Sequence, residues 1–317
     1  YPPRIRGIDG GGYFTEIPDV RIYTERGDRA FVNISKNGED SDTYREAPDT
    51  LQLRTAPGEI HRYTIRAYTV DEAGNRSETV TRKLTVDRAV VYVAPDGKDS
   101  FPGSRTEPFA TLERALYETR TTDRSTIYLA SGTYTVPAPI ELDERELSIR
   151  GGFSRQSWNP GGMETVLRAG EDFPSDTPLI RIRNGTFSCG DIILTNSSLS
   201  EALIHQSGRK SIVEVERTKL IHSERVNASL LDLSDGECTV RDSSIEFGPV
   251  SNGELISLED ARLVLEKSDI AGGSSSSRLH VIKARGGSIH VENSRIEPGS
   301  ARDITAIFSE NGHVELV

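Results

Sequence analysis

The chain has 317 residues, with 38 Lys and Arg against 49 Asp and Glu, and a formal net charge of −11. A chain this acidic does not coat nucleic acid or anionic lipid, and no apolar run approaches the ~20 residues that a membrane span needs. Its two cysteines permit at most one disulfide, which excludes a disulfide scaffold. The sequence begins YPPRIRG without an initiating Met, so we expect a piece of a longer chain.

The first 88 residues show the alternating polar and apolar pattern of short β-strands. The strand-like segments are RIYTE, RAFVNIS, TLQLRT, HRYTIRAYTV and ETVTRKLTV, separated by turn sequences such as NGED and DEAGN. Short strands at that spacing are typical of a β-sandwich. The stretch YTIRAYTVDEAGNRSETVTRKLTVDR resembles the last two strands of bacterial immunoglobulin-like modules. We therefore predict an immunoglobulin-like β-sandwich over residues 1–88 and interpret it as a spacer, since a fold alone does not supply function.

Residues 89–125 are predicted to form a lead-in segment with one short amphipathic helix. Phe109, Leu112, Ala115 and Leu116 recur at helical spacing, and Pro108 stands near the start. The turn YVAPDGKDSFPGS, the helix PFATLERAL and the strands IYLASGTY and IRGGF resemble the N-terminal region of pectate-lyase-like right-handed parallel β-helices. The resemblance covers roughly residues 90–168. It implies that the helix caps the open end of a solenoid, and it implies nothing specific about activity.

Residues 179–317 contain an internal repeat. The segments FSCGDIIL, VEVERTKL, CTVRDSSI, LVLEKSDI, IHVENSRI and VELV align, with their first positions spaced by 26, 25, 25, 26 and 25 residues. A turn of about 25 residues that carries at least two short strands indicates a parallel β-helix, whose rungs stack ~4.8 Å apart. A leucine-rich repeat is the rival fold, but its L-x-x-L-x-L pattern is absent from every turn. We predict an all-β chain with a parallel β-helix over residues 126–317, truncated at the C-terminus where the last repeat stops at Val317.

Reading the aligned segments down their columns predicts which side chains stack. Three apolar columns should face the interior, because alternate residues of a strand share a face. The first column is Phe187, Val213, Cys238, Leu263, Ile289 and Val314; the third is Cys189, Val215, Val240, Leu265, Val291 and Leu316; the eighth is Leu194, Leu220, Ile245, Ile270 and Ile296. A second strand is expected in each turn near Leu179, Leu203, Leu230, Leu255 and Val281. The sixth column is predicted to be a hydroxyl ladder at a bend: Ile192, Thr218, Ser243, Ser268 and Ser294.

The two cysteines point inward in this register. Cys189 and Cys238 stand two rungs apart, hence roughly 10 Å, which exceeds the Cα reach of a disulfide. We predict two buried free thiols that act as small hydrophobes and not as catalytic nucleophiles.

The outward columns are charged. The fourth reads Gly190, Glu216, Arg241, Glu266 and Glu292, and the fifth reads Asp191, Arg217, Asp242, Lys267 and Asn293. One interpretation is a polysaccharide lyase, in which neighbouring carboxylates hold Ca²⁺ and an Arg or Lys acts as the base. We favour the other interpretation, in which opposite charges on stacked rungs neutralise one another along a solvated face. A calcium cage needs clustered carboxylates, whereas the Asp and basic residues of the fifth column alternate.

Other site chemistry finds little support in the pattern. Asp191 and Asp242 would lie roughly 10 Å apart, beyond the separation that glycoside hydrolases use, and the repeat has no Tyr or Trp for sugar stacking. His290 and His313 occupy different columns, and His205, His222 and His280 are expected in or near the returns between strands. The DGKD turn at Asp96–Asp99 is interpreted as a structural turn in which Gly97 takes a special backbone angle.

The sequence therefore favours a non-enzymatic function and leaves an enzyme open. We expect an exported or bacterial cell-surface protein whose solenoid is a stalk or an adhesin-like interaction surface. The partners considered are a host or matrix protein or a polysaccharide, without nucleic acid. No catalytic, cofactor-binding or metal-ligating residues are assigned, with Ca²⁺ as the one cofactor considered. The alternative is a calcium-dependent lyase that cleaves acidic polysaccharide by β-elimination.

Overall fold

The computed structural model describes residues 1–14, 16–25, 27–39, 43–56, 58–161, 163–196, 202–222, 229–249, 253–276 and 278–317, without the side chain of Asn196. Contacts divide the chain into two units. The N-terminal unit comprises Tyr1–Val91 with Ser104–Thr106 and Arg120–Arg124, and the solenoid unit comprises Tyr92–Gly103, Glu107–Thr119 and Ser125–Val317.

The N-terminal unit contains two sheets. One has three antiparallel strands, in the order β1 (Arg4–Arg6), β3 (Val20–Tyr23) and β6 (Thr50–Leu51). The other has five strands, in the order β2 (Gly12–Phe14), β8 (Val80–Asp87), β7 (Ile60–Val70), β4 (Arg29–Lys36) and β5 (Arg45–Glu46). Its pairs are antiparallel except β2 with β8, which is parallel.

One hydrophobic core is shared by both sheets of this unit. Val20 and Leu51 come from the three-stranded sheet, and Val32, Ile65 and Val86 from the five-stranded sheet. Alternation along β7 produces this burial, because every second residue of the strand faces inward. The predicted strands are therefore present, while the immunoglobulin-like class remains a prediction.

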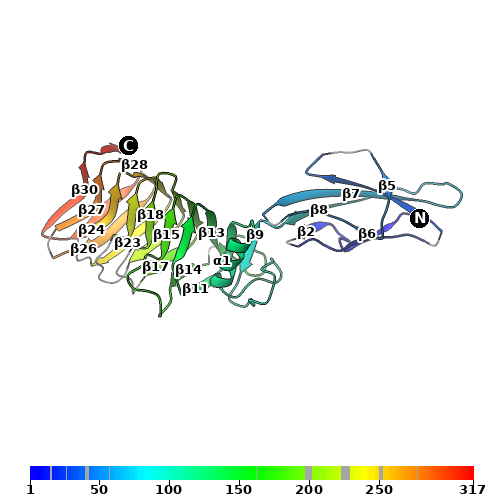
Figure 1. The fold of residues 1–317 in the computed structure, drawn as a ribbon, viewed down its shortest axis with the longest axis horizontal. Coiled ribbons are helices and arrows are strands. Elements are labelled where there is room, and N and C mark those ends of the chain that lie inside the picture. The colour runs from blue at the N-terminus through cyan, green and yellow to red at the C-terminus, as the bar shows by residue number, and fades with distance from the viewer. Residues whose placement is uncertain are drawn as a thin grey trace. The chain divides into compact units, whose positions relative to one another are not determined.

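One helix is present among the described residues, α1 (Leu112–Thr121). It lies at the first-turn end of the stacked solenoid strands (Figure 1) and buries Leu112, Ala115 and Leu116, as the helical spacing predicts. The helix start is fixed by Asp99, whose Oδ1 accepts hydrogen bonds from the Ala110 and Thr111 amides at 3.0 Å. Thr111 Oγ1 in turn accepts the Arg114 amide at 3.2 Å, as an N-cap residue does.

The solenoid has about seven turns of about 26 residues. Each regular turn carries three strands, one in each of three parallel sheets, which is one more strand than the minimum expected from the sequence. Sheet I is β9 (Val90–Val93), β10 (Thr126–Ala130), β13 (Glu146–Phe153), β16 (Thr186–Gly190), β19 (Ile212–Glu216), β22 (Glu237–Arg241), β25 (Arg262–Glu266), β28 (Ser288–Glu292) and β31 (His313–Leu316).

The other two solenoid sheets have seven strands each. Sheet II is β11 (Gly132–Val136), β14 (Thr165–Ala169), β17 (Ile193–Asn196), β20 (Lys219–His222), β23 (Ser244–Pro249), β26 (Asp269–Ser274) and β29 (Arg295–Ser300). Sheet III is β12 (Ile140–Asp143), β15 (Ile180–Arg183), β18 (Ile204–Ser207), β21 (Leu231–Ser234), β24 (Glu254–Glu259), β27 (Arg278–Arg285) and β30 (Asp303–Glu310). The chain runs through sheets III, I and II in that order in each turn.

The strand register confirms the predicted columns. Phe187 lies opposite Val213, which lies opposite Cys238, and Cys189 lies opposite Val215, which lies opposite Val240. The eighth column pairs in the same way in sheet II, from Leu194 to Ile296. These apolar side chains are buried along most of the solenoid, whereas Leu316 of the last strand is 67% exposed.

The predicted state of the cysteines is also confirmed. Cys189 and Cys238 are both buried free thiols. They occupy different columns, two strands apart in sheet I. Burial raises the pKa of the Cys189 thiol to about 12 and that of Cys238 further still, so neither is a thiolate at neutral pH.

The corner between sheets I and II contains the predicted hydroxyl ladder. The Ser243, Ser268 and Ser294 hydroxyls accept the backbone amides of Thr218, Ser243 and Ser268 on the preceding rung at 3.0–3.2 Å. Each hydroxyl also donates to the carbonyl two residues earlier, as Ser243 does to Arg241 at 2.7 Å. The residue before each ladder position has a left-handed backbone, from Asp191 (φ 58°) to Asn293 (φ 49°). The ladder thus pairs backbone groups that the sharp corner leaves out of the sheets.

Candidate functional site: a groove along the corner of sheets I and II

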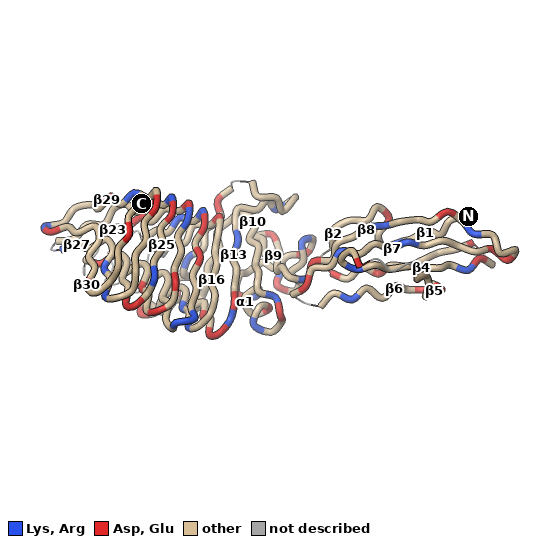
Figure 2. The backbone as a smooth tube through the Cα atoms, turned by 90° about the horizontal axis from the view of Figure 1, so that it is seen from above, with Lys and Arg blue, Asp and Glu red and all other residues tan. Residues whose placement is uncertain are grey.

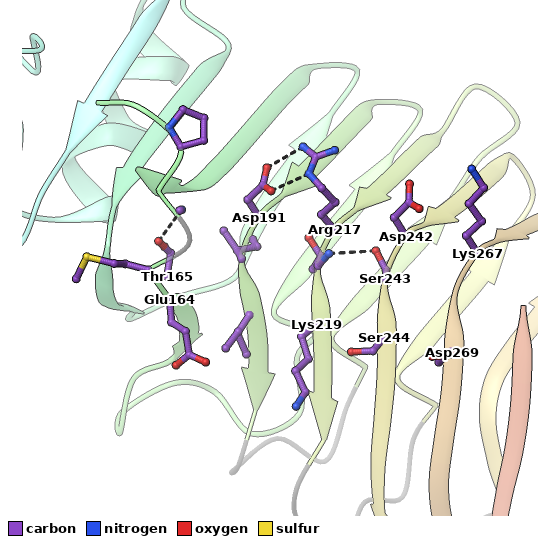
Figure 3. A pocket seen from close by; sticks show the side chains of 16 residues that line it. Glu164, Thr165, Asp191, Arg217, Lys219, Asp242, Ser243, Ser244, Lys267 and Asp269 are labelled. Carbon is purple, nitrogen blue, oxygen red and sulfur yellow. Dashed lines mark hydrogen bonds and ion pairs between the residues drawn. The ribbon is translucent and has the colours of Figure 1, made fainter. Parts of the chain in front are cut away.

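A groove with a volume of about 680 Å³ follows this corner over several turns (Figure 3). On one side are the corner residues and the first residues of the sheet II strands. On the other side are residues of the connection between β13 and β14. We call this site the corner groove, and its lining includes Met163, Glu164, Asp191, Arg217, Lys219, Asp242, Ser243, Ser244, Lys267 and Asp269.

The connection between β13 and β14 forms the wall of the groove because it is longer than the equivalent corners. Two residues join β16 to β17 and β19 to β20, whereas residues 154–164 join β13 to β14. The connection folds back on itself, since the Gly161 amide donates to the Gly152 carbonyl at 2.9 Å. Trp158 anchors it, with its ring 4.8 Å from that of Tyr92. Met163, which is 64% exposed, and Glu164 follow on the groove side.

Two rows of side chains run along the groove from rung to rung. The fifth column forms the row that we call the corner row: Asp191, Arg217, Asp242 and Lys267. The seventh column forms the strand row: Ile193, Lys219, Ser244 and Asp269. The hydroxyl ladder lies between them. Members of both rows line the same groove (Figure 3).

Asp191 and Arg217 form a closed ion pair at one end of the corner row. Arg217 Nε and Nη2 each donate to one Asp191 carboxylate oxygen at 2.8 Å, and Nη1 donates to Glu216. The hydrogen bond to Asp191 is the main reason that the pKa of Arg217 lies above its usual value. Arg217 therefore stays protonated and does not act as a base.

Glu216 also binds a second arginine, from two strands away. Arg150 Nη1 donates to Glu216 Oε2 at 3.0 Å, although β16 lies between their strands. The side chain crosses at Gly190, where an added Cβ would lie 2.1 Å from Arg150 Nη1. Burial disfavours ionised Glu216, but the Arg150 hydrogen bond and the Arg217 charge outweigh it, so the pKa of Glu216 lies below its usual value.

Opposite charges of the outward columns meet in direct ion pairs on some rungs and at longer range on others. Arg241 pairs with Glu266 at 2.6 Å in the fourth column, and Figure 2 shows basic and acidic positions on neighbouring turns of the solenoid. In the corner row, however, the side chains of Asp242 and Lys267 form no hydrogen bond and no ion pair with a described residue, although the charge of Asp242 acts on Arg241 and that of Lys267 on Glu266. Figure 3 shows the two side chains on neighbouring corners with no interaction between them.

In the strand row, Lys219 is paired and its two successors are not. Lys219 Nζ lies 2.8 Å from Glu246 Oε1 on the next strand. Ser244 and Asp269 have no side-chain partner within the described part of the chain. Among the described residues, the groups left free to meet a ligand are thus carboxylates, one ammonium, one hydroxyl and the N–H groups of Arg217 that are not used by Asp191 and Glu216.

The carboxylates of the groove are spread out along it. Asp191 and Asp242 lie two strands apart, which corresponds to roughly 10 Å. Over the described ranges, no three or more His, Cys, Asp or Glu side chains come close enough together to hold a metal ion. The groove therefore lacks the clustered oxygen ligands that Ca²⁺ prefers.

The DGKD turn has a structural role, and one expectation about it was wrong. Asp99 fixes the start of α1, as described above, and Asp96 accepts Arg155 Nε at 2.7 Å. Gly97 is not among the residues with positive φ. A glycine is needed there because a Cβ would lie 2.3 Å from the Phe109 carbonyl oxygen.

The three histidines that were expected in or near the returns lie in strands, close to the strand ends. His205 is the second residue of β18, His222 is the last residue of β20 and His280 is the third residue of β27. His205 faces outward on sheet III, with Nδ1 2.8 Å from Asp232 Oδ2 on the next rung. His280 is packed against Phe308 with ring centroids 5.0 Å apart, and burial lowers its pKa.

Sequence reasoning identified the corner row and missed the rest of the groove. The strand row was visible in principle, because Lys219, Ser244 and Asp269 occupy the seventh position of the same aligned repeat. The wall was not visible, because residues 154–164 precede the regular repeat and nothing in their composition says that they fold back.

Comparisons with known proteins find a family match for part of the chain. A family model described as a protein of unknown function (DUF1565) matches residues 95–187, from before α1 into β16. The solved structures that match include two of the catalytic domain of a GH87 alpha-1,3-glucanase, one in complex with tetrasaccharides and one with nigerose. Their identities are 9% and 11% and their TM-scores 0.24 and 0.19, and each alignment covers 92% of this chain and 87% of the other. TM-scores this low do not establish a common fold. No curated protein matches.

Proposed function

We propose that this protein is a non-enzymatic interaction module whose solenoid binds a partner along the corner groove. The observation that carries the proposal is the state of Arg217, the first candidate base of the corner row. Its guanidinium is held by Asp191 and Glu216 and stays protonated. The carboxylates of Asp191 and Glu216 are held in ion pairs with arginines. Such pairs fix the shape and charge of a binding surface, but they do not supply a free acid or base for catalysis.

We further propose a cell context and a finer classification. The protein acts outside the cell or at a bacterial surface, as a stalk or an adhesin, with a host or matrix protein or a polysaccharide as partner. The N-terminal unit is an immunoglobulin-like spacer, and the solenoid is a right-handed helix of the pectate-lyase-like class. The immunoglobulin-like class is supported by the sequence YTIRAYTVDEAGN, in which β7 ends in the DEAGN turn. The pectate-lyase-like class is supported by the turn, helix and strand motifs of residues 90–168. The described residues contain no helix with the length and apolar character of a membrane span.

The test separates binding from turnover. The chain is incubated with acidic polysaccharides with and without Ca²⁺, and the unsaturated products of β-elimination are followed alongside retention on the same immobilised polysaccharides and on matrix proteins. We expect retention without a change in polymer length. Calcium-dependent product formation would contradict the proposal.

A calcium-dependent lyase is kept as the second candidate because of Lys267. Its side chain forms no ion pair with a described residue and lines the groove, although its charge acts on Glu266. In its neutral amine form it would take the proton beside a uronate carboxyl, the electrons of that C–H bond would form the new double bond, and the glycosidic oxygen would leave with a proton from water. This candidate predicts product that is lost in Lys267→Ala and kept in Lys210→Ala, a matched change at an exposed lysine of another corner.

A further inference from the structure

The corner row presents donors and an acceptor in alternation. Arg217 uses three of its five N–H groups on Asp191 and Glu216, so two remain for a ligand. The next rung presents the Asp242 carboxylate, which only accepts, and the rung after that presents the Lys267 ammonium, which only donates. Since the side chains of Asp242 and Lys267 form no hydrogen bond or ion pair with a described residue, their donors and acceptors are available, and a complementary ligand presents an acceptor, a donor and an acceptor in that order.

The spacing of the row selects the kind of polymer. Neighbouring rungs are ~4.8 Å apart, so Arg217 and Lys267 stand roughly 10 Å apart along the axis. An extended peptide places same-face side chains about 6.6–6.8 Å apart and loses register with the rungs after one step. Sugar residues of an extended polysaccharide advance by nearly one rung each, so such a chain stays in register.

The character of the groove also suits a hydrophilic chain. Its volume of about 680 Å³ is within the range of ligand sites. None of the described residues that line it is aromatic, so a sugar chain would be held by hydrogen bonds and charges and not by ring stacking. Beside the corner row, Ser244 and Asp269 offer hydrogen-bonding groups without partners in the described structure.

We propose that the corner groove binds a linear polysaccharide in which a uronate alternates with a neutral sugar. The inference rests on the proposed function and names its ligand. One uronate carboxylate accepts from the two spare N–H groups of Arg217, and the next uronate pairs with Lys267. The neutral sugar between them donates an O–H or N–H to Asp242. A polymer with a carboxylate on every sugar is rejected, because one carboxylate then meets Asp242 without a proton between them.

The test measures equilibrium binding of two oligosaccharides to the whole chain. Oligosaccharides of hyaluronan carry glucuronate alternating with N-acetylglucosamine, and oligogalacturonate carries a carboxylate on every sugar. We expect the hyaluronan oligosaccharide to bind more tightly. Lys267→Gln should weaken its binding by about tenfold, whereas the matched change Lys210→Gln, at an exposed lysine outside the groove, should leave it unchanged.

Asp242→Asn provides the decisive variant. It removes the repulsion and keeps a hydrogen-bonding side chain, so it should raise the affinity for oligogalacturonate. The variant should fold, because Asn tolerates the left-handed backbone at this position (φ 48°), and circular dichroism checks this. Equal binding of both oligosaccharides by the wild type, or an unchanged preference in Asp242→Asn, would overturn the proposal.

The outcomes also separate this inference from the proposed function. Binding of a matrix protein but of neither oligosaccharide overturns the ligand and leaves the interaction module standing. Release of unsaturated product from a bound alternating polymer contradicts the non-enzymatic function and supports the ligand.

Discussion

The N-terminal unit and the solenoid bury their apolar side chains in different ways. In the N-terminal unit, β4 and β7 run antiparallel, so that Val32 lies opposite Ala67, and both side chains are fully buried. This pair does not belong to a sequence repeat, so no other pair has the same surroundings. In the solenoid, parallel pairing places Val215, Val240 and Leu265 in one stack. The column of a solenoid residue therefore predicts its environment, whereas the environment of an N-terminal residue depends on individual neighbours far away in the sequence.

The largest expected effect tests the column rule directly. Val240→Asp places a carboxylate in the fully buried third column and should cost several kcal/mol, because an unpaired charge is not stable there. Arg241→Asp, one residue along the same strand, loses the half-exposed pair with Glu266 and places a carboxylate beside Glu216 and Glu266. It should cost only about 1 kcal/mol, because these charges are exposed to solvent. Urea unfolding of both variants measures the difference.

An equivalent substitution on the neighbouring rung provides the control. Val215 stacks directly on Val240 and is also buried, so Val215→Asp should destabilise to a similar degree. If Val240→Asp unfolds at the wild-type urea concentration, the assignment of inward columns is wrong.

The same contrast explains which parts of the fold were predictable. Six aligned segments sample one structural position repeatedly, so the inward columns, the hydroxyl ladder and the buried cysteines follow from the sequence. In the N-terminal unit, strand segments were visible but their partners were not. Nothing in residues 12–14 indicates that β2 pairs in parallel with β8, because no repeat samples that pairing.

The candidate site was predictable to a smaller extent. The corner row could be read as a charged column, but which charges pair depends on side-chain reach. Arg150 reaches across Gly190 and pairs with Glu216, two strands away. Asp242 and Lys267 carry opposite charges on neighbouring rungs and yet form no ion pair with each other. The groove itself arises from the connection at residues 154–164, which belongs to no repeat.

Substitutions in the hydroxyl ladder should reduce the free energy of unfolding by an intermediate amount, and they test whether equivalent rungs behave alike. Ser243→Ala and Ser268→Ala should each cost about 1–3 kcal/mol, because each leaves the backbone amide of the preceding rung unpaired at a buried corner. The two losses should agree closely, since the rungs are equivalent. Thermal or urea unfolding measures them.

Ser244→Ala is the matched control for the ladder. Its hydroxyl is adjacent to Ser243 but has no partner in the described part of the chain, so the change should stay within about 0.5 kcal/mol. Ser243→Thr should retain most of the stability, because Thr218 already occupies the equivalent position one rung earlier. Equal losses for Ser243→Ala and Ser244→Ala would show that the ladder contributes nothing.

Gly190 is the uncharged residue of the fourth column, and its substitution should lower the free energy of unfolding by less than the ladder substitutions do. Gly190→Ala forces Arg150 away from Glu216, which should cost about 1 kcal/mol because the pair is partly exposed. A double-mutant cycle with Arg150→Ala measures the coupling. In the Arg150→Ala background the glycine substitution should be nearly neutral, and a full loss there would point to backbone strain at Gly190.

The smallest expected effect concerns the acid stability that Glu216 contributes. Its pKa is lowered in the folded chain, so its stabilisation is present above the unfolded value of about 4.3 and is lost as the pH falls through the folded value. Because Glu216 is 34% exposed, the loss should stay below about 1 kcal/mol. Glu216→Gln should therefore flatten the fall in unfolding free energy between about pH 5 and pH 3. Glu214→Gln, an exposed change on the same strand, should leave that slope as in the wild type, and the same flattening in both variants would assign the effect to net charge and not to the Arg150 pair.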